Sequence, residues 1–150
     1  MKKKEENIII ASDHAGFFLK KKILEYSFEN FIFFEDLGPQ NEQSVDYPDY
    51  AHKLSEKVNK GLYKKGILIC GTGIGMSIVA NRYENVRAAL CLNEKMSKLA
   101  REHNNANLIV LGSRLISEQL AIKCLKCFFS ENFAEGRHKF RLKKFNNILD

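Results

Sequence analysis

Residues 66–77 read GILICGTGIGMS, an apolar run that enters a turn with glycine at every second position. The run is typical of a buried strand, and a helical pattern begins at Ile74. Backbone N–H groups at the start of a helix stabilise negative charge. Cys70 ends the strand beside these groups, so its thiol should ionise more easily than that of a free cysteine. The stretch therefore predicts either a site for proton abstraction or a tight strand–helix turn with an inert thiol.

Alternation of strand and helix continues along the whole chain. The patterns predict strands at 7–12, 31–35, 66–70, 86–91 and 107–111, and helices at 15–28, 48–60, 74–82, 94–103, 117–129 and 137–148. The strands are continuous apolar runs, as in a parallel sheet that is covered on both faces. We therefore predict an α/β fold with a doubly wound, five-stranded parallel sheet and helices on both faces. The 150 residues fit a single domain, 1–150.

The charge distribution leaves several kinds of partner open. The formal net charge is +6, and much of the excess lies at 2–4 and 137–144. A basic terminal segment can bind nucleic acid, form a solvated helix face or bind a small phosphorylated ligand. No apolar stretch approaches the ~20 residues of a membrane span, and the charged start does not resemble a signal peptide. We expect a cytoplasmic protein that does not engage a membrane.

The four cysteines lie in apolar segments, which suits reduced core thiols better than a disulfide framework. Cys124 and Cys127 have the spacing of a CxxC motif, but they fall in the middle of a helical pattern. A redox CxxC normally opens a helix, and a zinc site needs further ligands that the sequence does not offer. We interpret this pair as core packing and expect no metal and no cofactor.

Polar residues follow several of the predicted strands. Ligands of such sheets bind beyond the carboxyl ends of the strands. The residues that we place at this edge are Asp13 and His14 after the first strand, the glycine turn after the third, Arg114 after the fifth, and His103 and Asn104 at the end of a helix. Two of them have simpler explanations, since Asp13 could cap the next helix and His103 could interact with a helix dipole.

The glycine turn and the C-terminal segment both suit a small anion. The spacing G-x-G-x-G is neither a dinucleotide fingerprint nor a P-loop, so the anion should be smaller than a nucleotide. Arg137 and Arg141 are spaced i, i+4 and share one helix face, where two guanidinium groups can hold a phosphate or simply form a basic surface. Leu142, Phe145 and Leu149 form an apolar stripe that could dock this helix on another body.

Six motifs together resemble the B-type ribose-5-phosphate isomerases. These belong to the sugar-phosphate isomerase family that also includes galactose-6-phosphate and allose-6-phosphate isomerases. The motifs are SDHAG at 12–16, DYP at 46–48, CGTGIG at 70–75, HN at 103–104, GSR at 112–114, and GRH at 136–138 with Arg141. They follow the family's order and cover the chain from Ile8 to about Phe145.

The resemblance implies a metal-free isomerase that interconverts D-ribose 5-phosphate and D-ribulose 5-phosphate through an enediolate. It implies that Cys70 is the base, that Thr72 helps to move protons between two sugar oxygens, and that His103 opens the furanose ring. The implied substrate-binding residues are Asp13 and Asn104 for hydroxyls, His14, Arg114, Arg137 and Arg141 for the phosphate, Gly71, Gly73, Ile74 and Gly75 for the enediolate, and Tyr47.

The resemblance also implies the quaternary arrangement. Family members are homodimers or pairs of dimers in which each active site draws on both subunits. The implied fold is a Rossmann-like sheet with a C-terminal helix that docks on the partner subunit. This chain carries the full set of site residues, which favours a self-sufficient homodimer over two unlike subunits.

Two alternatives remain beside this interpretation. The first keeps the chemistry but acts on a hexose 6-phosphate, such as allose or galactose 6-phosphate. The second is a non-catalytic sugar-phosphate or RNA-binding protein that uses the basic C-terminal helix. A binding module has no need of an ionisable thiol in an anion-binding turn, so Cys70 favours an enzyme. RNA binding would also favour exposed aromatic residues among the basic ones, whereas Phe140 and Phe145 fit helix docking, so we expect no nucleic-acid partner.

Overall fold

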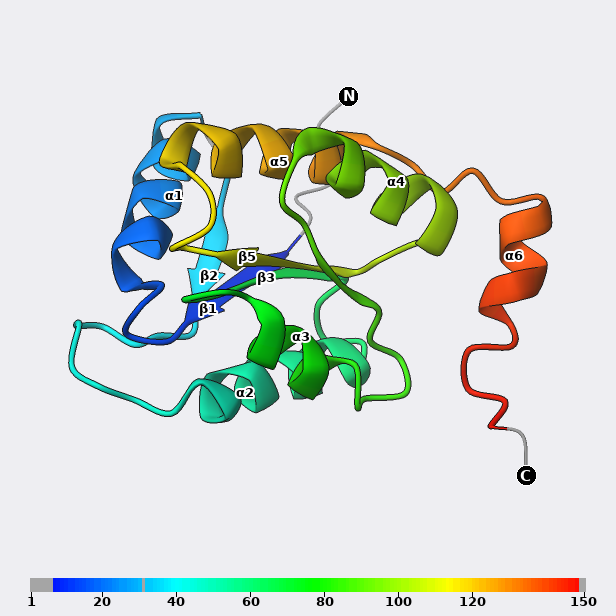
Figure 1. Ribbon diagram of the computed structural model, residues 1–150, viewed down its shortest axis with the longest axis horizontal. Coiled ribbons are helices and arrows are strands. Elements are labelled where there is room, and N and C mark those ends of the chain that lie inside the picture. The colour runs from blue at the N-terminus through cyan, green and yellow to red at the C-terminus, as the bar shows by residue number, and fades with distance from the viewer. Residues whose placement is uncertain (1–6, 31, 149–150) are drawn as a thin grey trace.

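The protein forms one parallel sheet between two layers of helices (Figure 1). The computed structural model describes residues 7–30 and 32–148. The strands are β1 (Ile8–Ser12), β2 (Phe34–Asp36), β3 (Lys65–Cys70), β4 (Ala88–Leu90) and β5 (Leu108–Gly112), paired in parallel in the order β2-β1-β3-β5-β4. The predicted five-stranded parallel sheet is confirmed.

Helices cover both faces of this sheet. They are α1 (Phe17–Glu29), α2 (Tyr47–Asn59), α3 (Ile74–Ala80), α4 (Glu94–Asn104), α5 (Glu118–Ser130) and α6 (Arg137–Leu142). Figure 1 shows α1, α4 and α5 on one face and α2 and α3 on the other, with α6 beyond one end of the sheet. Within residues 7–30 and 32–148, no helix is long and apolar enough to cross a membrane.

The strands divide their side chains between two cores. On β3, Ile67 and Ile69 join the core beneath α1, α4 and α5, whereas Leu68 and Cys70 join the core beneath α2 and α3. Alternate side chains of a strand point to opposite faces of the sheet. Continuous apolar runs are therefore required where both faces are covered. This alternation directs the Cys70 side chain toward the layer that contains α3.

Two helices begin at residue types that favour the start of a helix. The Ser117 hydroxyl accepts a hydrogen bond from the N–H of Leu120 at 3.1 Å and so caps the N-terminus of α5. Pro48 stands in the first turn of α2, where its missing N–H costs no helical hydrogen bond.

Two strand boundaries differ from their predictions. The strand predicted at 31–35 begins only at Phe34, because Phe33 is exposed and outside the β1 ladder, while Phe31 lies outside the described residues. The strand predicted at 86–91 is limited to Ala88–Leu90, the three residues that pair with β5.

The prediction of a helix over 137–148 is wrong, because α6 ends at Leu142. Beyond it the backbone hydrogen bonds reach back three residues instead of four. The N–H of Lys144 donates to the carbonyl of Arg141, and the N–H of Phe145 donates to that of Leu142. Bonds that reach back three residues are typical of turns and 3₁₀ segments, which seldom continue.

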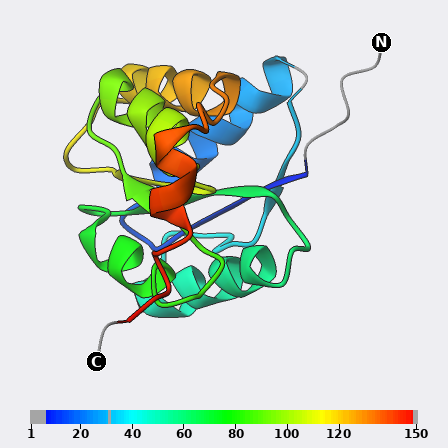
Figure 2. The same ribbon diagram turned by 90° about the vertical axis from the view of Figure 1, so that its right-hand side faces the viewer.

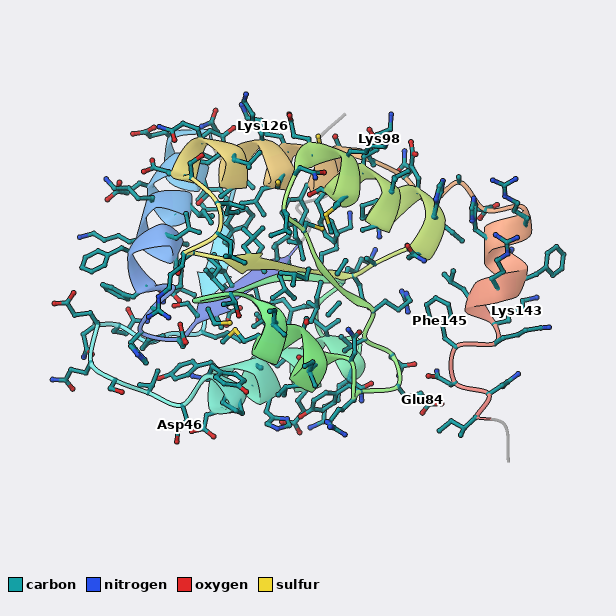
Figure 3. The ribbon with its side chains drawn as sticks, viewed as in Figure 1. Asp46, Glu84, Lys98, Lys126, Lys143 and Phe145 are labelled. Atoms are coloured by element: carbon teal, nitrogen blue, oxygen red, sulfur yellow. The ribbon has the colours of Figure 1, made fainter. Side chains whose placement is uncertain are left out.

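A side-chain contact also draws the chain away from the helix axis. Asn146 donates its Nδ2 to the carbonyl of Glu84 at 3.0 Å. Glu84 and Phe145 are labelled together at this end of the molecule in Figure 3. Of the predicted apolar stripe, Phe145 lies past the helix and Leu149 lies outside the described residues.

Candidate active site

The strand order predicts a ligand crevice between the ends of β1 and β3. After β1 the chain continues to β2, on one side of this pair of strands, and after β3 it continues to β4 and then β5, both on the other side. Crevices at such switch points bind ligands beyond the carboxyl ends of the strands. Here the loops are tied together, because the N–H of Asp13 donates to the carbonyl of Ile69 and the Ser113 hydroxyl donates to that of Ala15. The loop after β1 and the glycine turn therefore face one crevice.

The glycine turn wraps back on the sulfur of Cys70. The N–H of Gly73 lies 3.1 Å from Cys70 Sγ and donates to it. Gly73 has a φ of +78°, and a Cβ there would lie 2.5 Å from the Leu90 side chain. Only glycine satisfies both conditions at this position. The turn thus gives the sulfur a backbone hydrogen bond, and Cys70 is only 4% exposed.

Tyr47 and Arg114 flank the same turn. A Cβ on Gly75 would lie 2.5 Å from the Tyr47 ring, and a Cβ on Gly71 would lie 2.8 Å from an Arg114 nitrogen. These distances show that an aromatic ring and a guanidinium group pack directly on the glycines. The exposed Thr72 accepts the N–H of Ile74 on its Oγ1 at 3.3 Å, a long contact that leaves the hydroxyl available to a ligand.

Asp13 and His14 both have structural partners at the crevice. Asp13 Oδ1 accepts the N–H of Gly16 at 2.9 Å, so the carboxylate caps the turn that leads into α1. His14 Nδ1 lies 3.2 Å from both the backbone N–H and the carbonyl oxygen of Val45. Val45 was not predicted as part of the site, because a residue that acts through its backbone leaves no signal in the sequence.

The structure brings most of the predicted site residues together. The carboxyl-edge group consists of Asp13, His14, Tyr47, Cys70, Gly71, Thr72, Gly73, Ile74, Gly75 and Arg114. It combines a thiol, backbone donors, a histidine and a guanidinium group, which suits proton abstraction from a small anionic substrate.

His103 and Asn104 do not belong to this group, so their predicted place at the same edge is wrong. They end α4, and the chain then enters β5 at Leu108. A helix that precedes a parallel strand ends at the amino edge of the sheet. Figure 2, which views the molecule from that end, shows α6 in front of the sheet beside the end of α4.

A second group of polar residues forms where α4 meets α6. The rings of His103 and His138 stack with their centroids 4.2 Å apart and 13° between their planes. Burial, followed by the nearby charges of His103, Arg137 and Arg141, lowers the pKa of His138 from its ordinary value of 6.5. Arg137 and Arg141 are both exposed. We call His103, Asn104, Arg137 and Arg141 the amino-edge group.

The two groups lie at opposite ends of the folded chain. Asp46, which directly precedes α2 at the carboxyl edge, and Phe145, which follows α6, are labelled at opposite ends of Figure 3. A cavity of about 480 Å³ separates the C-terminal segment from the body and is lined by Asn104, Arg87, Tyr83, Leu142 and Phe145 among others. A single chain therefore does not bring all the predicted site residues together.

The remaining cysteines are core residues. Cys91 and Cys124 are buried in the same core, Cys124 as a residue of α5, and Cys127 is half-buried on α5. Burial raises the pKa of Cys91 to about 11 and raises the pKa values of Cys124 and Cys127. These thiols stay protonated at neutral pH, in keeping with the packing interpretation of the CxxC spacing. In the part of the chain that is described, no three His, Cys, Asp or Glu residues are grouped to hold a metal ion.

The chain is similar in sequence and in fold to known proteins over nearly its whole length. A sequence model described as Ribose/Galactose Isomerase matches residues 8–145. A crystal structure of a ribose 5-phosphate isomerase from Thermotoga maritima is 50% identical, with a TM-score of 0.92 and coverage of 95% of this chain and 98% of that one.

Two further proteins extend the comparison. Ribose-5-phosphate isomerase B from Mycoplasma genitalium, solved with bound ribulose-5-phosphate, is 43% identical with a TM-score of 0.89 and coverage of 94% of both chains. Ribose-5-phosphate isomerase B from Escherichia coli is 34% identical over 143 residues, which cover 95% of this chain and 96% of the relative. These identities extend over nearly full lengths, and the chain therefore belongs to the ribose/galactose isomerase family.

Proposed function

We propose that this protein interconverts D-ribose 5-phosphate and D-ribulose 5-phosphate through an enediolate, with Cys70 as the base. The observation that carries the proposal is the Cys70 sulfur at the carboxyl end of β3, held by the N–H of Gly73 in the ligand crevice. Membership of the family and the likeness to a relative solved with bound ribulose-5-phosphate support it.

The chemistry needs one base and a stabilised oxyanion. The Cys70 thiolate takes the proton from C2 of the open-chain aldose, and the electron pair forms a C1–C2 double bond with negative charge on the carbonyl oxygen. Return of the proton to C1 gives the ketose. Donors of the glycine turn stabilise the oxyanion, where one donor can contribute ~3 kcal/mol. The Thr72 hydroxyl helps to move the proton between the two sugar oxygens.

The amino-edge group completes the site from a second subunit in this proposal. Arg137 and Arg141 join His14 and Arg114 around the phosphate, while His103 opens the furanose ring and Asn104 holds a hydroxyl. A homodimer, alone or paired with another, brings α6 of one subunit to the carboxyl edge of its partner. Exposed apolar side chains near the glycine turn support an interface there: Ile74, Ile78 and Leu115 are 50%, 56% and 52% exposed.

A coupled assay with ribose 5-phosphate, allose 6-phosphate and galactose 6-phosphate tests the proposed reaction. We expect the highest kcat/KM with ribose 5-phosphate. A preference for either hexose would make the protein a hexose-phosphate isomerase with the same chemistry. If the protein turned over none of the three sugars, the proposal would be contradicted.

Replacement of either arginine of α6 should weaken substrate binding. Loss of one charge-assisted contact costs roughly 1.5–3 kcal/mol, so Arg137→Ala and Arg141→Ala should each raise KM about 10- to 150-fold. Unfolding temperatures should hardly change, because both side chains are exposed. Lys139→Ala is the matched control, since Lys139 is an exposed cation of the same helix at a spacing that puts it on another face. Normal KM values for both arginine variants would show that α6 is only a basic surface and does not bind the substrate.

The double variant Cys124→Ala/Cys127→Ala should retain wild-type kcat and KM. Both thiols lie on α5, away from the glycine turn, and burial keeps them protonated. Its unfolding temperature should fall modestly, since Cys124 is fully buried and its sulfur leaves a small cavity. Turnover and thermal unfolding of the purified variant check this. A large loss of activity with normal folding would show that the packing interpretation is wrong.

A further inference from the structure

The α1 residue Lys20 is a buried cation outside the site described above. Its side chain is 1% exposed, and Nζ donates to Asp36 Oδ1 at 2.7 Å and to the carbonyl oxygen of Pro39 at 2.6 Å. Asp36 ends β2, and Pro39 lies in the loop over 37–46 that joins β2 to α2. The ammonium group thus ties α1 to the beginning of this loop.

Stability alone is a poor explanation for this contact. Burial lowers the pKa of Lys20, although the hydrogen bond and charge of Asp36 oppose the shift. Removing an ammonium ion from water is unfavourable, and an apolar side chain of similar size often stabilises a core equally well. A cation at this position is better explained by the backbone geometry that it enforces.

The beginning of the 37–46 loop is held firmly by this arrangement. Asp36 Oδ1 also accepts the N–H of Gly38 at 2.9 Å, and the carbonyl of Gly38 accepts the N–H of Ser12 at 3.1 Å. Lys20 therefore fixes the loop against the end of β1. Lys53 of α2 adds a hydrogen bond from its Nζ to the carbonyl of Leu37 at 2.8 Å.

The other end of the loop reaches the substrate crevice. Residues 40–44 are exposed, and Val45 then meets His14 Nδ1 through its backbone. Two residues later, Tyr47 begins α2 and packs on Gly75 of the glycine turn. The loop therefore connects the buried ammonium at one end with two site residues at the other.

We propose that Lys20 is a positioning residue. By fixing the start of the 37–46 loop, it sets the orientation of His14 and the packing of the Tyr47 ring on the glycine turn. Lys20 does not contact the substrate. The proposal rests on the proposed isomerase function for its kinetic consequences. Its structural consequence, the order of the loop, does not depend on that function.

The test compares Lys20→Met with Lys21→Met, which removes an exposed lysine from the same helix. We expect Lys20→Met to raise KM for ribose 5-phosphate about tenfold and to change kcat by less than about twofold, because small misplacements weaken binding while the base stays in place. In hydrogen–deuterium exchange, residues 40–47 should exchange faster than in the wild type, and the core strands should not. Lys21→Met should match the wild type in both measurements.

A double-mutant cycle with His14→Ala separates positioning from general stability. If Lys20 acts on binding through His14, Lys20→Met should raise KM much less in the His14→Ala background than in the wild type. Independent effects of the two substitutions, or unchanged exchange of 40–47, would overturn the proposal. If Lys20→Met does not fold, Asp36→Asn removes the other charge of the pair and should produce the same loop exchange and KM change. A wild-type protein that does not isomerise ribose 5-phosphate would refute the proposed function, and the exchange measurement would still decide the role of Lys20.

Discussion

The variant Cys70→Ala should lose isomerase activity and keep its fold and its affinity for the sugar phosphate. Removal of a general base lowers a rate by roughly 10²- to 10⁴-fold, and in the carboxyl-edge group Cys70 supplies the thiol. The side chain is small and ends a strand whose other contacts are backbone hydrogen bonds and apolar packing. Turnover measured with the coupled assay, together with calorimetric binding of ribose 5-phosphate, separates the loss of chemistry from a loss of binding.

Cys70→Ser sharpens this test. A serine hydroxyl is nearly the same size and can accept the N–H of Gly73, but it ionises far less readily than a thiol. We expect Cys70→Ser to be almost as inactive as Cys70→Ala, although its turn geometry is preserved. The double variant of Cys124 and Cys127 controls for a general effect of losing thiols. Near-wild-type turnover by Cys70→Ala would refute the assignment of the base.

The carboxyl-edge group was largely predictable because its signals are local. The run at 66–70 is apolar at every position, which only a strand buried on both faces requires. The turn that follows combines close approach with a positive φ at Gly73, and both demand glycine. A strand of this kind, followed by such a turn and a helix, fixes the place of Cys70 with no knowledge of the rest of the chain.

The prediction placed His103 and Asn104 at the wrong edge of the sheet, because the order of motifs along the chain does not show at which edge each one lies. His103 and Asn104 end a helix that runs back across the sheet, so they reach the edge opposite to the one reached by Asp13. The connection of α4 to β5 could have revealed this, since a parallel strand must begin where the preceding helix ends. The length of α6 was not predictable in the same way, because the contact of Asn146 with Glu84 joins residues far apart in sequence.

Long-range polar contacts explain the other omissions. Lys20 falls in a segment that reads FFLKKK, where a lysine is ordinarily expected on the solvent side of a helix. Its burial depends on Asp36 and on the carbonyl of Pro39, and nothing in the sequence identifies these two residues as its partners. The stacking of His138 on His103 likewise depends on how α6 meets α4.

Mixing Cys70→Ala, which lacks the base, with Arg137→Ala, which binds substrate weakly, should restore activity at low substrate concentration if each site draws on two subunits. Cys70 belongs to the carboxyl-edge group and Arg137 to the amino-edge group at the other end of the same protomer. In a two-fold symmetric heterodimer, one site then receives both lesions and the other receives neither. About half of the sites in each heterodimer should be functional, or about a quarter of all sites after complete exchange of equal amounts.

The matched control mixes Cys70→Ala with Thr72→Ala, whose lesions lie in the same glycine turn. Every site of that heterodimer contains one damaged turn, so activity should stay at the level of the separate variants. Native mass spectrometry must first show that mixed dimers have formed in both samples. Activity that returns only with Cys70→Ala and Arg137→Ala requires the turn and α6 of one site to come from different subunits. If mixed dimers form and no activity returns, the two groups do not meet across a dimer interface, and α6 must reach the crevice of its own subunit or leave the site altogether.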